Sequence, residues 1–426
     1  MPRLTCLFAA IALAICLAAQ TGSKASKRYV ISDFGAVADA TTVNTKAIQA
    51  AIDKCAASGG GVVVAPKGTF LSGAIFLKQG VNLLVEKDGV LKGTTNIDDY
   101  PVIQTRWEGS EEPWTSAFIN AEGMTDLEIS GEGTIDGSGE EWLQKNPPRA
   151  PGSAPSQPPS PPRRGRPRLV GIQNSKRVHV AGLNLHNQAV WCLFILYSED
   201  VLAENLKITA EHNIPSSDGI DIDSSRRVRI NNVYIDVNDD CISIKSGKDA
   251  DGLRVNRPAE DIVVENSHFA YGHGGVAMGS ETSGGIRNVE VRNCVADSGN
   301  WAPIRFKTQP SRGGVVENIT YRDITLHATR QAFEFNLEWR MAPPIAPPAK
   351  VLPVVRNVKI INVSGDVDSV GIIHGLADSP IRDIHFENCR IAAQKGFKLE
   401  HARNVDLAGL TLDVKNGEAV TKTDVQ

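Results

Sequence analysis

Apolar and polar residues alternate in a short pattern that recurs along most of the chain. An apolar-x-apolar triplet is followed by Asn or Gly and then by a second alternating stretch, as in RVHVAGLNL, RVRINNVYI and DIVVENSHF. Alternation with a period of two predicts β-strands that bury one face and expose the other. The first apolar residues of nine such copies are Val178, Val201, Val228, Ile262, Val289, Ile319, Val358, Ile384 and Val405.

The spacing of these copies indicates how the strands are arranged. Successive copies are 21 to 39 residues apart, and no helical periodicity lies between them. Such steps are too short for β-α-β crossovers throughout the chain. Strands that return after one turn and stack on the preceding turn form a solenoid with one long core. We therefore predict an all-β fold, a single-domain right-handed parallel β-helix over residues 28–420.

Asparagine and cysteine recur at fixed places in the pattern. Asparagines follow the first strand of several copies, where their amides suit a sharp bend and can stack as a ladder; they are Asn205, Asn232, Asn266, Asn293 and Asn388. Cys241, Cys294 and Cys389 fall at inward positions, as small buried hydrophobes would. Five cysteines follow residue 25, an odd number without close pairs, which argues against a disulfide framework or a zinc site.

Three segments depart from the repeat. Residues 44–61 have Asn44 as a candidate N-cap, an apolar stripe and a terminal run of glycines, so we predict a helix that covers the N-terminal end of the solenoid. Residues 146–168 and 341–353 are rich in proline and should be excursions outside the sheets.

The N-terminus and the net charge bear on location and partners. Residues 1–25 contain Arg3, an apolar run and then small residues, which is typical of a signal peptide, so we expect a secreted or periplasmic protein without a membrane span. Lipid attachment at Cys16 is disfavoured because Ile15 precedes it. A net charge of -4 argues against a general nucleic-acid binder. We expect a monomer.

Two adjacent carboxylates interrupt one predicted strand, VNDDCISIKSG. Inward positions are odd-numbered up to Val237 and even-numbered from Ile242, so the strand must bend between them. A bend would turn Asp239 and Asp240 both toward the solvent face. Asp218 lies 21 residues before the first of them, about one coil away. Three neighbouring carboxylates raise at least one pKa, as acid/base catalysis requires, although a solvated acidic face or a calcium site fits the same spacing.

Other candidate residues follow along the chain. His273 lies among three glycines in YGHGGV, which leaves room for a ligand beside its imidazole, although a lone histidine is more often structural. Arg305 and Lys307 are two apart on a strand and therefore share a face. Two cations on one face can bind an anionic sugar, or they are ordinary surface charge.

Four motifs, SSDGID, NDDCISIKSG, GHGG and RFK, occur in this order on the β-helical repeat and resemble the polygalacturonases of glycoside hydrolase family 28. The stretches DFGAVADATTVNTKAIQAAID and GTIDGSG resemble the N-terminal part of that family, so the resemblance covers nearly all of the chain after the signal. It implies hydrolysis of α-1,4-galacturonide bonds in a pectic polysaccharide or oligogalacturonide, with inversion and without metal or organic cofactor.

The resemblance also implies roles for the catalytic residues. Asp239 would be the general acid on the glycosidic oxygen, and Asp218 and Asp240 would activate the water. His273 would support the proton balance of the acid. Inversion ordinarily needs acid and base about 6.5 to 9.5 Å apart, and we expect facing positions on stacked coils to supply that distance.

Substrate binding is implied in the same way. Arg305 and Lys307 would bind the galacturonate carboxylate next to the scissile bond. The first motif has two serines where the family usually has Asn-Thr, and Phe306 stands where the family usually has Ile. These departures affect the substrate detail more than the chemistry, so rhamnogalacturonan or xylogalacturonan hydrolysis is the main alternative.

The loop at residues 246–261, SGKDADGLRVNRPAED, should sprout beside the acid and close one end of the groove. It resembles an insertion of exo-acting family members, and Arg254 and Arg257 could hold a terminal carboxylate. We therefore predict exo-action, with the proline-rich residues 146–168 as a candidate second wall. More distant alternatives are a calcium-dependent pectate lyase on the same architecture and a non-catalytic β-helix that binds polysaccharide.

Overall fold

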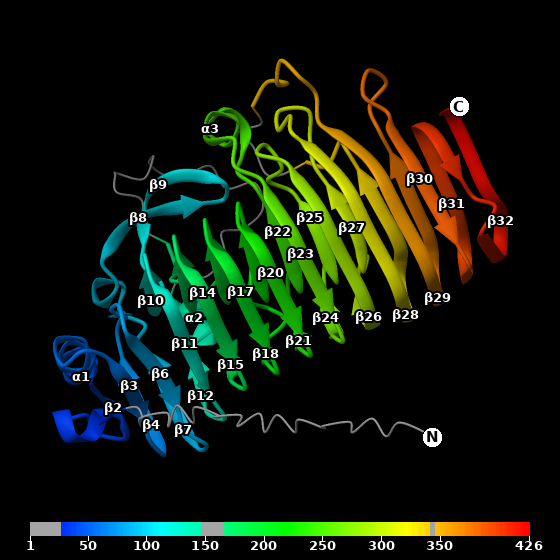
Figure 1. Cartoon of the computed structure of the whole chain (residues 1–426). Helices are drawn as coiled ribbons and strands as arrows, with labels where there is room; N and C mark the ends of the chain where they lie inside the picture. Colours follow the sequence, from blue (N-terminus) through cyan, green and yellow to red (C-terminus); the bar gives the residue numbers. More distant parts are fainter. Residues whose placement is uncertain (1–26, 146–164, 341–345) are drawn as a thin grey trace, which may run out of the picture.

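A computed structural model describes residues 27–145, 165–340 and 346–426 of the protein. Over these residues the chain winds into a right-handed parallel β-helix, whose coils stack from the N-terminal to the C-terminal end (Figure 1). The described strands run from Arg28 to Val425. The predicted residues 1–25 of a signal peptide, and most of the proline-rich segment, lie outside the described residues.

Three ladders of short parallel strands form most of the sides. The first ladder comprises β5 (Ile75–Phe76), β10 (Ile119–Glu122), β13 (Val170–Gln173), β16 (Leu193–Leu196), β19 (Ile220–Asp223), β22 (Ile242–Lys245), β25 (Val276–Gly279) and β27 (Ile304–Lys307). The second comprises β1 (Arg28–Val30), β3 (Gly61–Ala65), β6 (Val81–Val85), β11 (Thr125–Gly131), β14 (Lys176–Ala181), β17 (Glu199–Glu204), β20 (Arg226–Asn231) and β23 (Ala259–Glu265). The third comprises β2 (Asp39–Val43), β4 (Gly68–Ser72), β7 (Gly89–Gly93), β12 (Thr134–Asp136), β15 (Asn184–His186), β18 (Lys207–Thr209), β21 (Tyr234–Asp236) and β24 (His268–Gly272).

Six strands complete the C-terminal coils, and all of them except the seven-residue β30 are long and bend through more than one side of the solenoid. They are β26 (Ile286–Asn300), β28 (Val315–Asn336), β29 (Val354–His374), β30 (Ile381–Glu387), β31 (Cys389–Asp406) and β32 (Leu410–Val425). Short 3-10 turns are η1 (Ile31–Phe34) and η2 (Ile97–Asp99).

The nine copies of the sequence repeat lie in the second ladder and in the C-terminal strands that continue it. Val178 lies opposite Val201, and the pairing continues coil by coil through all nine apolar residues to Val405. All of them except the last are buried in the core. The predicted β-helix and its repeat are therefore confirmed.

The predicted asparagine ladder is present, with one interruption. Three side-chain amides donate to the amide oxygen of the preceding coil: Asn232 to Asn205, Asn293 to Asn266, and Asn388 to Asn362. Between the first two pairs, Asn266 donates to Asn231 instead. These turn residues have positive φ angles, of 55° at Asn205 and 52° at Asn232. Asparagine tolerates this left-handed backbone better than most residues, which explains its recurrence.

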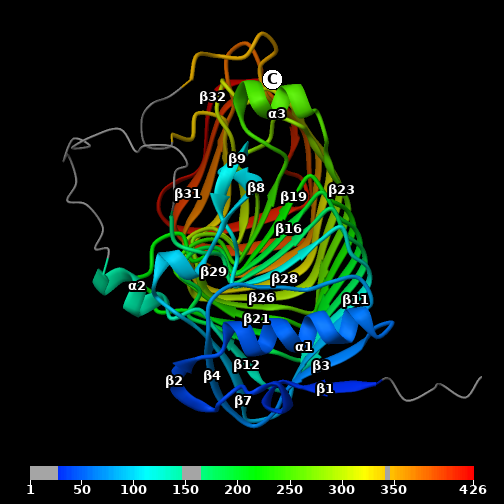
Figure 2. The ribbon, with the colours of Figure 1, turned by 90° about the vertical axis from the view of Figure 1, so that its left-hand side faces the viewer.

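The N-terminal end of the solenoid is covered by helix α1 (Thr45–Ala57), as predicted (Figure 2). Ile48, Ala51 and Ile52 are buried on its inner face. Asn44 precedes the helix, but its side chain does not cap it. The Asn44 Oδ1 atom accepts a hydrogen bond of 2.7 Å from the Val37 backbone N–H, so it fastens the preceding loop instead.

The C-terminal end looks different in the described residues. The last strand, β32, has one neighbour, β31, and no described helix lies over it. Its inward residues Leu410, Leu412 and Val414 are only partly buried. The core is therefore closed at one end and partly open at the other.

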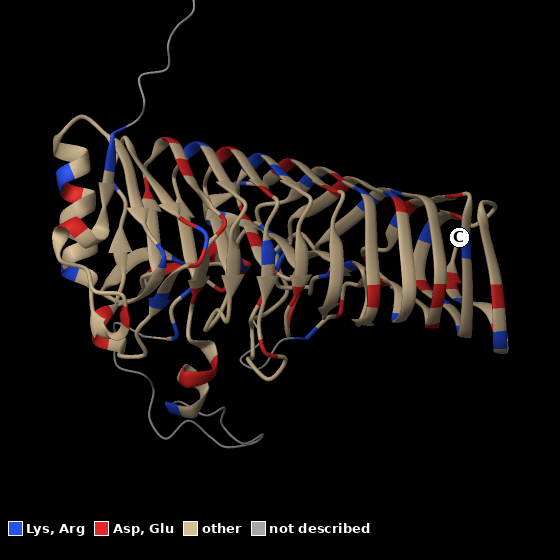
Figure 3. Ribbon diagram, turned by 90° about the horizontal axis from the view of Figure 1, so that it is seen from below, with Lys and Arg blue, Asp and Glu red and all other residues tan. Residues whose placement is uncertain are grey.

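Charges of both signs are interspersed along the coils (Figure 3). Many form ion pairs between neighbouring coils, such as Arg227 with Asp200 at 2.5 Å and Arg287 with Glu260 at 2.6 Å. Such a surface agrees with the small net charge. None of the helices in the described ranges is long and apolar enough to cross a membrane.

Two insertions project beside the first ladder. Strands β8 (Val102–Trp107) and β9 (Ser110–Thr115) form an antiparallel hairpin, which the sequence pattern did not reveal. The segment predicted as a loop at residues 246–261 contains the short helix α3 (Asp249–Val255), which lies near the hairpin (Figure 1). Another short helix, α2 (Gly139–Lys145), precedes the proline-rich segment.

Candidate active site

The first ladder brings the predicted catalytic motifs onto adjacent coils. Ile220, Ile242 and Val276 lie in one register. Asp218 and Asp240 are each two residues before their strand and so occupy equivalent positions. The coil-to-coil step here is 22 residues, so Asp218 lies opposite Asp240 and not opposite the residue before it, as the sequence spacing had suggested.

The predicted bend is confirmed at residues 237–241, between β21 and β22. It exposes only one of the two adjacent carboxylates. The Asp239 side chain is 26% exposed, whereas that of Asp240 is 0% exposed. The prediction that both reach solvent was wrong for Asp240, because Arg305 and Lys307 from the coils that follow lie over it.

Asp240 is held in a cage of donors. Lys307 Nζ lies 2.5 Å from its Oδ2 atom and Arg305 Nη1 lies 3.3 Å from Oδ1. Ser243 Oγ donates a third hydrogen bond of 3.0 Å. Burial would raise the pKa of Asp240, but the Lys307 and Arg305 charges outweigh it and hold that pKa well below its ordinary value. Asp240 is therefore an ionised carboxylate. Arg305 also contacts Glu334 at 2.8 Å.

The three carboxylates are closer together than expected. Asp218, Asp239 and Asp240 each offer an oxygen atom, and these atoms all lie within 4.8 Å of one another. The expected 6.5 to 9.5 Å is not found between them. Strands in a sheet are only about 4.7–4.9 Å apart, so facing positions on adjacent coils cannot supply the longer distance.

Asp218 differs from Asp240 in its surroundings. Burial, followed by the neighbouring charges of Asp221 and Asp239, raises the pKa of Asp218 well above its ordinary value. Lys245 opposes this shift, with its Nζ atom 3.8 Å from Asp218 Oδ2. The two buried carboxylates thus have pKa values shifted in opposite directions, as acid/base sites often require.

Three clustered carboxylates are also the kind of group that binds hard metal ions. Here Lys307 and Arg305 already neutralise Asp240, and Lys245 lies beside Asp218. A divalent cation would have to displace these side chains or be repelled by their positive charges. The residues present therefore fit proton transfer better than a calcium site.

His273 lies one coil beyond Asp239 and contacts it. His273 Nδ1 is 3.2 Å from Asp239 Oδ1, and this hydrogen bond raises the pKa of His273. The adjacent glycines serve the packing of the coils. A Cβ atom at Gly274 would lie 2.9 Å from Asp240 Oδ1, and one at Gly272 would lie 2.7 Å from the Asp239 carbonyl oxygen. Their small size is thus required by the protein itself, and not only by a ligand.

One cavity collects five of the predicted residues, namely Asp218, Asp239, His273, Arg305 and Lys307. It is also lined by residues that sequence reasoning missed: Trp107, Glu108, Trp191, Ser216, Lys245, Ser280, Glu281 and Trp339. Lys245 lies within the NDDCISIKSG motif, and its outward parity on β22 could have identified it. Trp107 could not be placed, because it comes from the unpredicted hairpin.

Comparison with known proteins gives this cavity a context. Residues 55–416 match the model of glycosyl hydrolases family 28. The chain belongs to this family. It is 30% identical over 370 residues to a probable polygalacturonase of Vitis vinifera, covering 84% of this chain and 73% of that protein. It is 29% identical over 300 residues to an endo-polygalacturonase of Pectobacterium carotovorum subsp. carotovorum, covering 68% of this chain and 70% of that protein.

A solved structure shows the same likeness. A hyperthermoactive exopolygalacturonase from Thermotoga maritima has a TM-score of 0.74 and 28% sequence identity, with 93% of this chain and 91% of that chain covered. The resemblance drawn from the four motifs is confirmed. As a family 28 glycosidase, the chain is a hydrolase, which disfavours the pectate lyase alternative.

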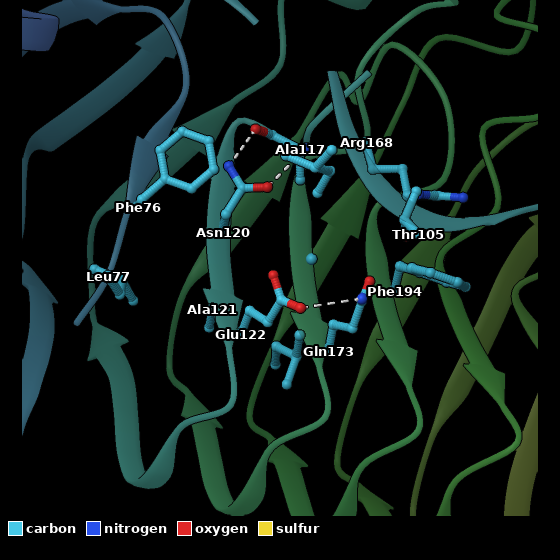
Figure 4. A pocket seen from close by; sticks show the side chains of 13 residues that line it. Phe76, Leu77, Thr105, Ala117, Asn120, Ala121, Glu122, Arg168, Gln173 and Phe194 are labelled. Carbon is cyan, nitrogen blue, oxygen red and sulfur yellow. Dashed lines mark hydrogen bonds between the residues drawn. The ribbon is translucent and has the colours of Figure 1, made fainter. Parts of the chain in front are cut away.

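In this family 28 glycosidase, the hairpin β8–β9 separates two pockets on the first ladder. Trp107 and Glu108 line the cavity that holds Asp218 and Asp239. Thr105, from the same hairpin, lines a second pocket nearer the N-terminal end, where Phe76 and Phe194 lie on opposite sides (Figure 4). The hairpin therefore crosses the face along which a polysaccharide would otherwise extend.

The hairpin is anchored firmly to the solenoid. Arg106 Nη1 lies 2.7 Å from Asp223 Oδ1, and both side chains are buried. Trp107 stacks on Trp191 with ring centroids 5.0 Å apart. Arg168, which was expected to belong to the proline-rich excursion, is instead buried with its guanidinium 4.9 Å from the Trp191 ring.

Arg254 and Arg257 do not line the cavity. Arg254 Nη2 pairs with Glu111 at 2.6 Å and with Asp251 at 2.7 Å, and Arg257 donates to the Tyr197 carbonyl oxygen at 2.9 Å. In this structure they tie the α3 segment to the hairpin and to the turn after β16. Their binding of a terminal carboxylate stays a prediction, as does the wall at residues 246–261, whereas the hairpin supplies Trp107 and Glu108 to the cavity lining.

Proposed function

We propose that this glycosidase is secreted and hydrolyses α-1,4-galacturonide bonds of pectin from a chain end. One observation carries the proposal. A partly exposed carboxylate paired with a histidine, the buried Asp218 and two cations line one cavity, and the same two cations hold the buried Asp240. The polygalacturonases among its relatives support a pectic substrate. An N-terminal export signal in the sequence supports secretion.

The geometry supports distinct roles for the three carboxylates. Asp239 has the most exposed side chain of the three and can reach a glycosidic oxygen, while His273 at 3.2 Å assists its proton exchange. Asp240 stays ionised and, with Asp218, orients and deprotonates the attacking water. Arg305 and Lys307 face the cavity with donors left for the galacturonate carboxylate.

Release of reducing ends from polygalacturonan, rhamnogalacturonan and xylogalacturonan tests the proposed substrate. We expect the fastest release from polygalacturonan. Ultraviolet absorbance of the products should stay flat, since elimination alone creates a conjugated double bond. Preference for either of the other two polymers would favour the alternative hydrolase, and absence of any new reducing ends would favour a binding protein.

We also propose inversion. Both Asp240 oxygens are engaged by Lys307, Arg305 and Ser243, so the carboxylate is poorly placed to attack a sugar carbon itself. Water is then the nucleophile, although the carboxylates are closer than in most inverting sites. Proton NMR of the first product should show the β-anomer ahead of mutarotation. An initial α-anomer would instead show a covalent, retaining route.

The hairpin supports exo-action, because Trp107 and Glu108 stand at the N-terminal side of the cavity. We expect monomer as the first product from polygalacturonan, with slow loss of viscosity per reducing end formed. The paired measurement of viscosity and reducing ends checks this. An early steep fall in viscosity, with oligomers preceding monomer, would show that the polymer passes the hairpin.

A further inference from the structure

Lys245 occupies a place in the cavity that the proposed mechanism does not use. It points outward from β22, yet its side chain is only 6% exposed. Its Nζ atom lies 3.1 Å from Asp221, 3.7 Å from Glu281 and 3.8 Å from Asp218. The same atom lies 4.1 Å from the centre of the Trp191 ring. One lysine therefore lies within ion-pair distance of three buried carboxylates.

These surroundings oppose the charge that Asp218 needs. Asp221 and Glu281 are both buried, and apart from Lys245 the Asp221 carboxylate and Glu281 Oε2 have no hydrogen-bond donor in the described structure. Burial raises the pKa of Asp221 to about 6, even with Lys245 beside it. Without the lysine, Asp218 would face only negative neighbours on this side. Its proton would then be difficult to remove.

We propose that Lys245 is a positioning residue that favours the ionised form of Asp218 and orients it toward the attacking water. The inference rests on the proposed function, because it assigns Asp218 to the base side of hydrolysis. It differs from anion binding. Lys245 faces an excess of carboxylates, so an anionic sugar would gain little from its charge, whereas Arg305 and Lys307 face the other side of the cavity.

The charged groups around this position come from several coils. They are Asp218 and Asp221 from the β19 segment, Asp239 and Asp240 from the bend before β22, Glu281 after β25, Lys307 from β27, Arg312 after β27, Arg168 before β13 and Glu108 from the hairpin. Lys245 is the cation that contacts both Asp218 and Asp221 among the described ion pairs. Its removal also affects Glu281, but Glu281 keeps the neighbouring positive charges of Arg312 and Lys307. The effect should therefore be largest on Asp218 and Asp221.

The test is the pH profile of kcat/KM for Lys245→Met, on whichever pectic polymer the wild type cleaves. The acid limb, which is the fall in kcat/KM as the pH is lowered, should move to higher pH by about one unit or more. One adjacent charge shifts a pKa by roughly that amount. At a fixed pH below this limb, kcat/KM of the variant should be lower than that of the wild type by about tenfold for each pH unit by which the limb moves. The kcat should drop more than KM rises, and Lys245→Arg should restore both.

A matched control is Lys92→Met, which removes a lysine paired with Glu141 at 2.8 Å, outside the cavity. It should leave the profile unchanged. If the single variant does not fold, Lys245→Met is combined with Asp221→Asn, because the double variant buries one uncompensated carboxylate fewer. The limb should still move in the double variant, by a smaller amount.

Infrared titration gives a readout that does not need a substrate. At a pH between the acid limbs of the wild type and the variant, Lys245→Met should show one more protonated carboxyl than the wild type, and adding Asp218→Asn should remove that signal. An unchanged limb and an unchanged infrared spectrum in a folded variant would overturn the inference. So would a salt-sensitive rise in KM alone, or movement of the alkaline limb alone. Inactivity of the wild type on every pectic polymer would instead contradict the proposed function.

Discussion

Asp239→Asn should lower kcat by at least about two to four orders of magnitude, the range that general acid catalysis contributes. The amide keeps the shape of the side chain and can still contact His273, but it has no proton to give to the leaving oxygen. The wild-type Asp239 side chain is partly exposed, and its ion-pair partner is the exposed His273 and not a buried lysine or arginine. The fold should therefore tolerate the change. Reducing-end release and the midpoint of thermal unfolding measure the two effects.

A suitable control is Asp126→Asn, which alters an exposed carboxylate of β11 that is paired with Arg177 at 2.6 Å, outside the cavity. Both variants should unfold near the wild-type temperature, and only the first should lose activity. Turnover above about a tenth of wild type in Asp239→Asn would exclude it as the general acid, since that role contributes at least about a hundredfold.

Neutralising Arg305 and Lys307 together, as Arg305→Gln with Lys307→Met, should abolish cleavage and also destabilise the protein. Loss of each charge-assisted hydrogen bond to the substrate should cost roughly 1.5 to 3 kcal/mol. The sequence alone predicts that folding suffers far less than cleavage. The structure changes that expectation, because the same two cations compensate the fully buried Asp240. Breaking a buried ion pair costs about 3–5 kcal/mol of unfolding free energy.

Adding Asp240→Asn to the double variant separates the two effects. The triple variant no longer buries Asp240 as an uncompensated charge, although Glu334 still lacks its Arg305 partner, so it should regain part of the unfolding free energy measured in denaturant, while activity stays lost. A double variant that cleaves galacturonan normally would rule out the anion site. A triple variant no more stable than the double would show that the two cations do not stabilise the fold through Asp240.

The fold could be predicted because the residues that define the repeat are those that must face the core. Val178, Val201 and Val228 lie in one register, as their common place in the pattern predicted. A one-residue slip would expose a whole strand's apolar set, so the core fixes the register strongly. The hairpin β8–β9 had no such signal. It packs on residues of distant coils through Trp107 and Arg106, and its sequence does not follow the repeat.

The site was predictable in its residues and less so in its geometry. The change of phase near Asp239 correctly marked a bend, since inward positions switch parity there. It could not tell that Asp240 would be buried, because that depends on Arg305 and Lys307, which lie two coils later and reach back over it. The separation of the carboxylates was misjudged because the spacing of stacked strands, and not the sequence, determines it.

The unequal ends of the solenoid bear on the order in which it comes apart. In a solenoid each coil is held only by its neighbours, so local opening starts at an end and travels inward. Helix α1 seals one end, whereas β32 leaves Leu410 and Leu412 partly exposed at the other. Amide hydrogen exchange should therefore be fastest in β32 and slow progressively toward β28. The coils beyond β28 can thus fray without disturbing the three clustered carboxylates.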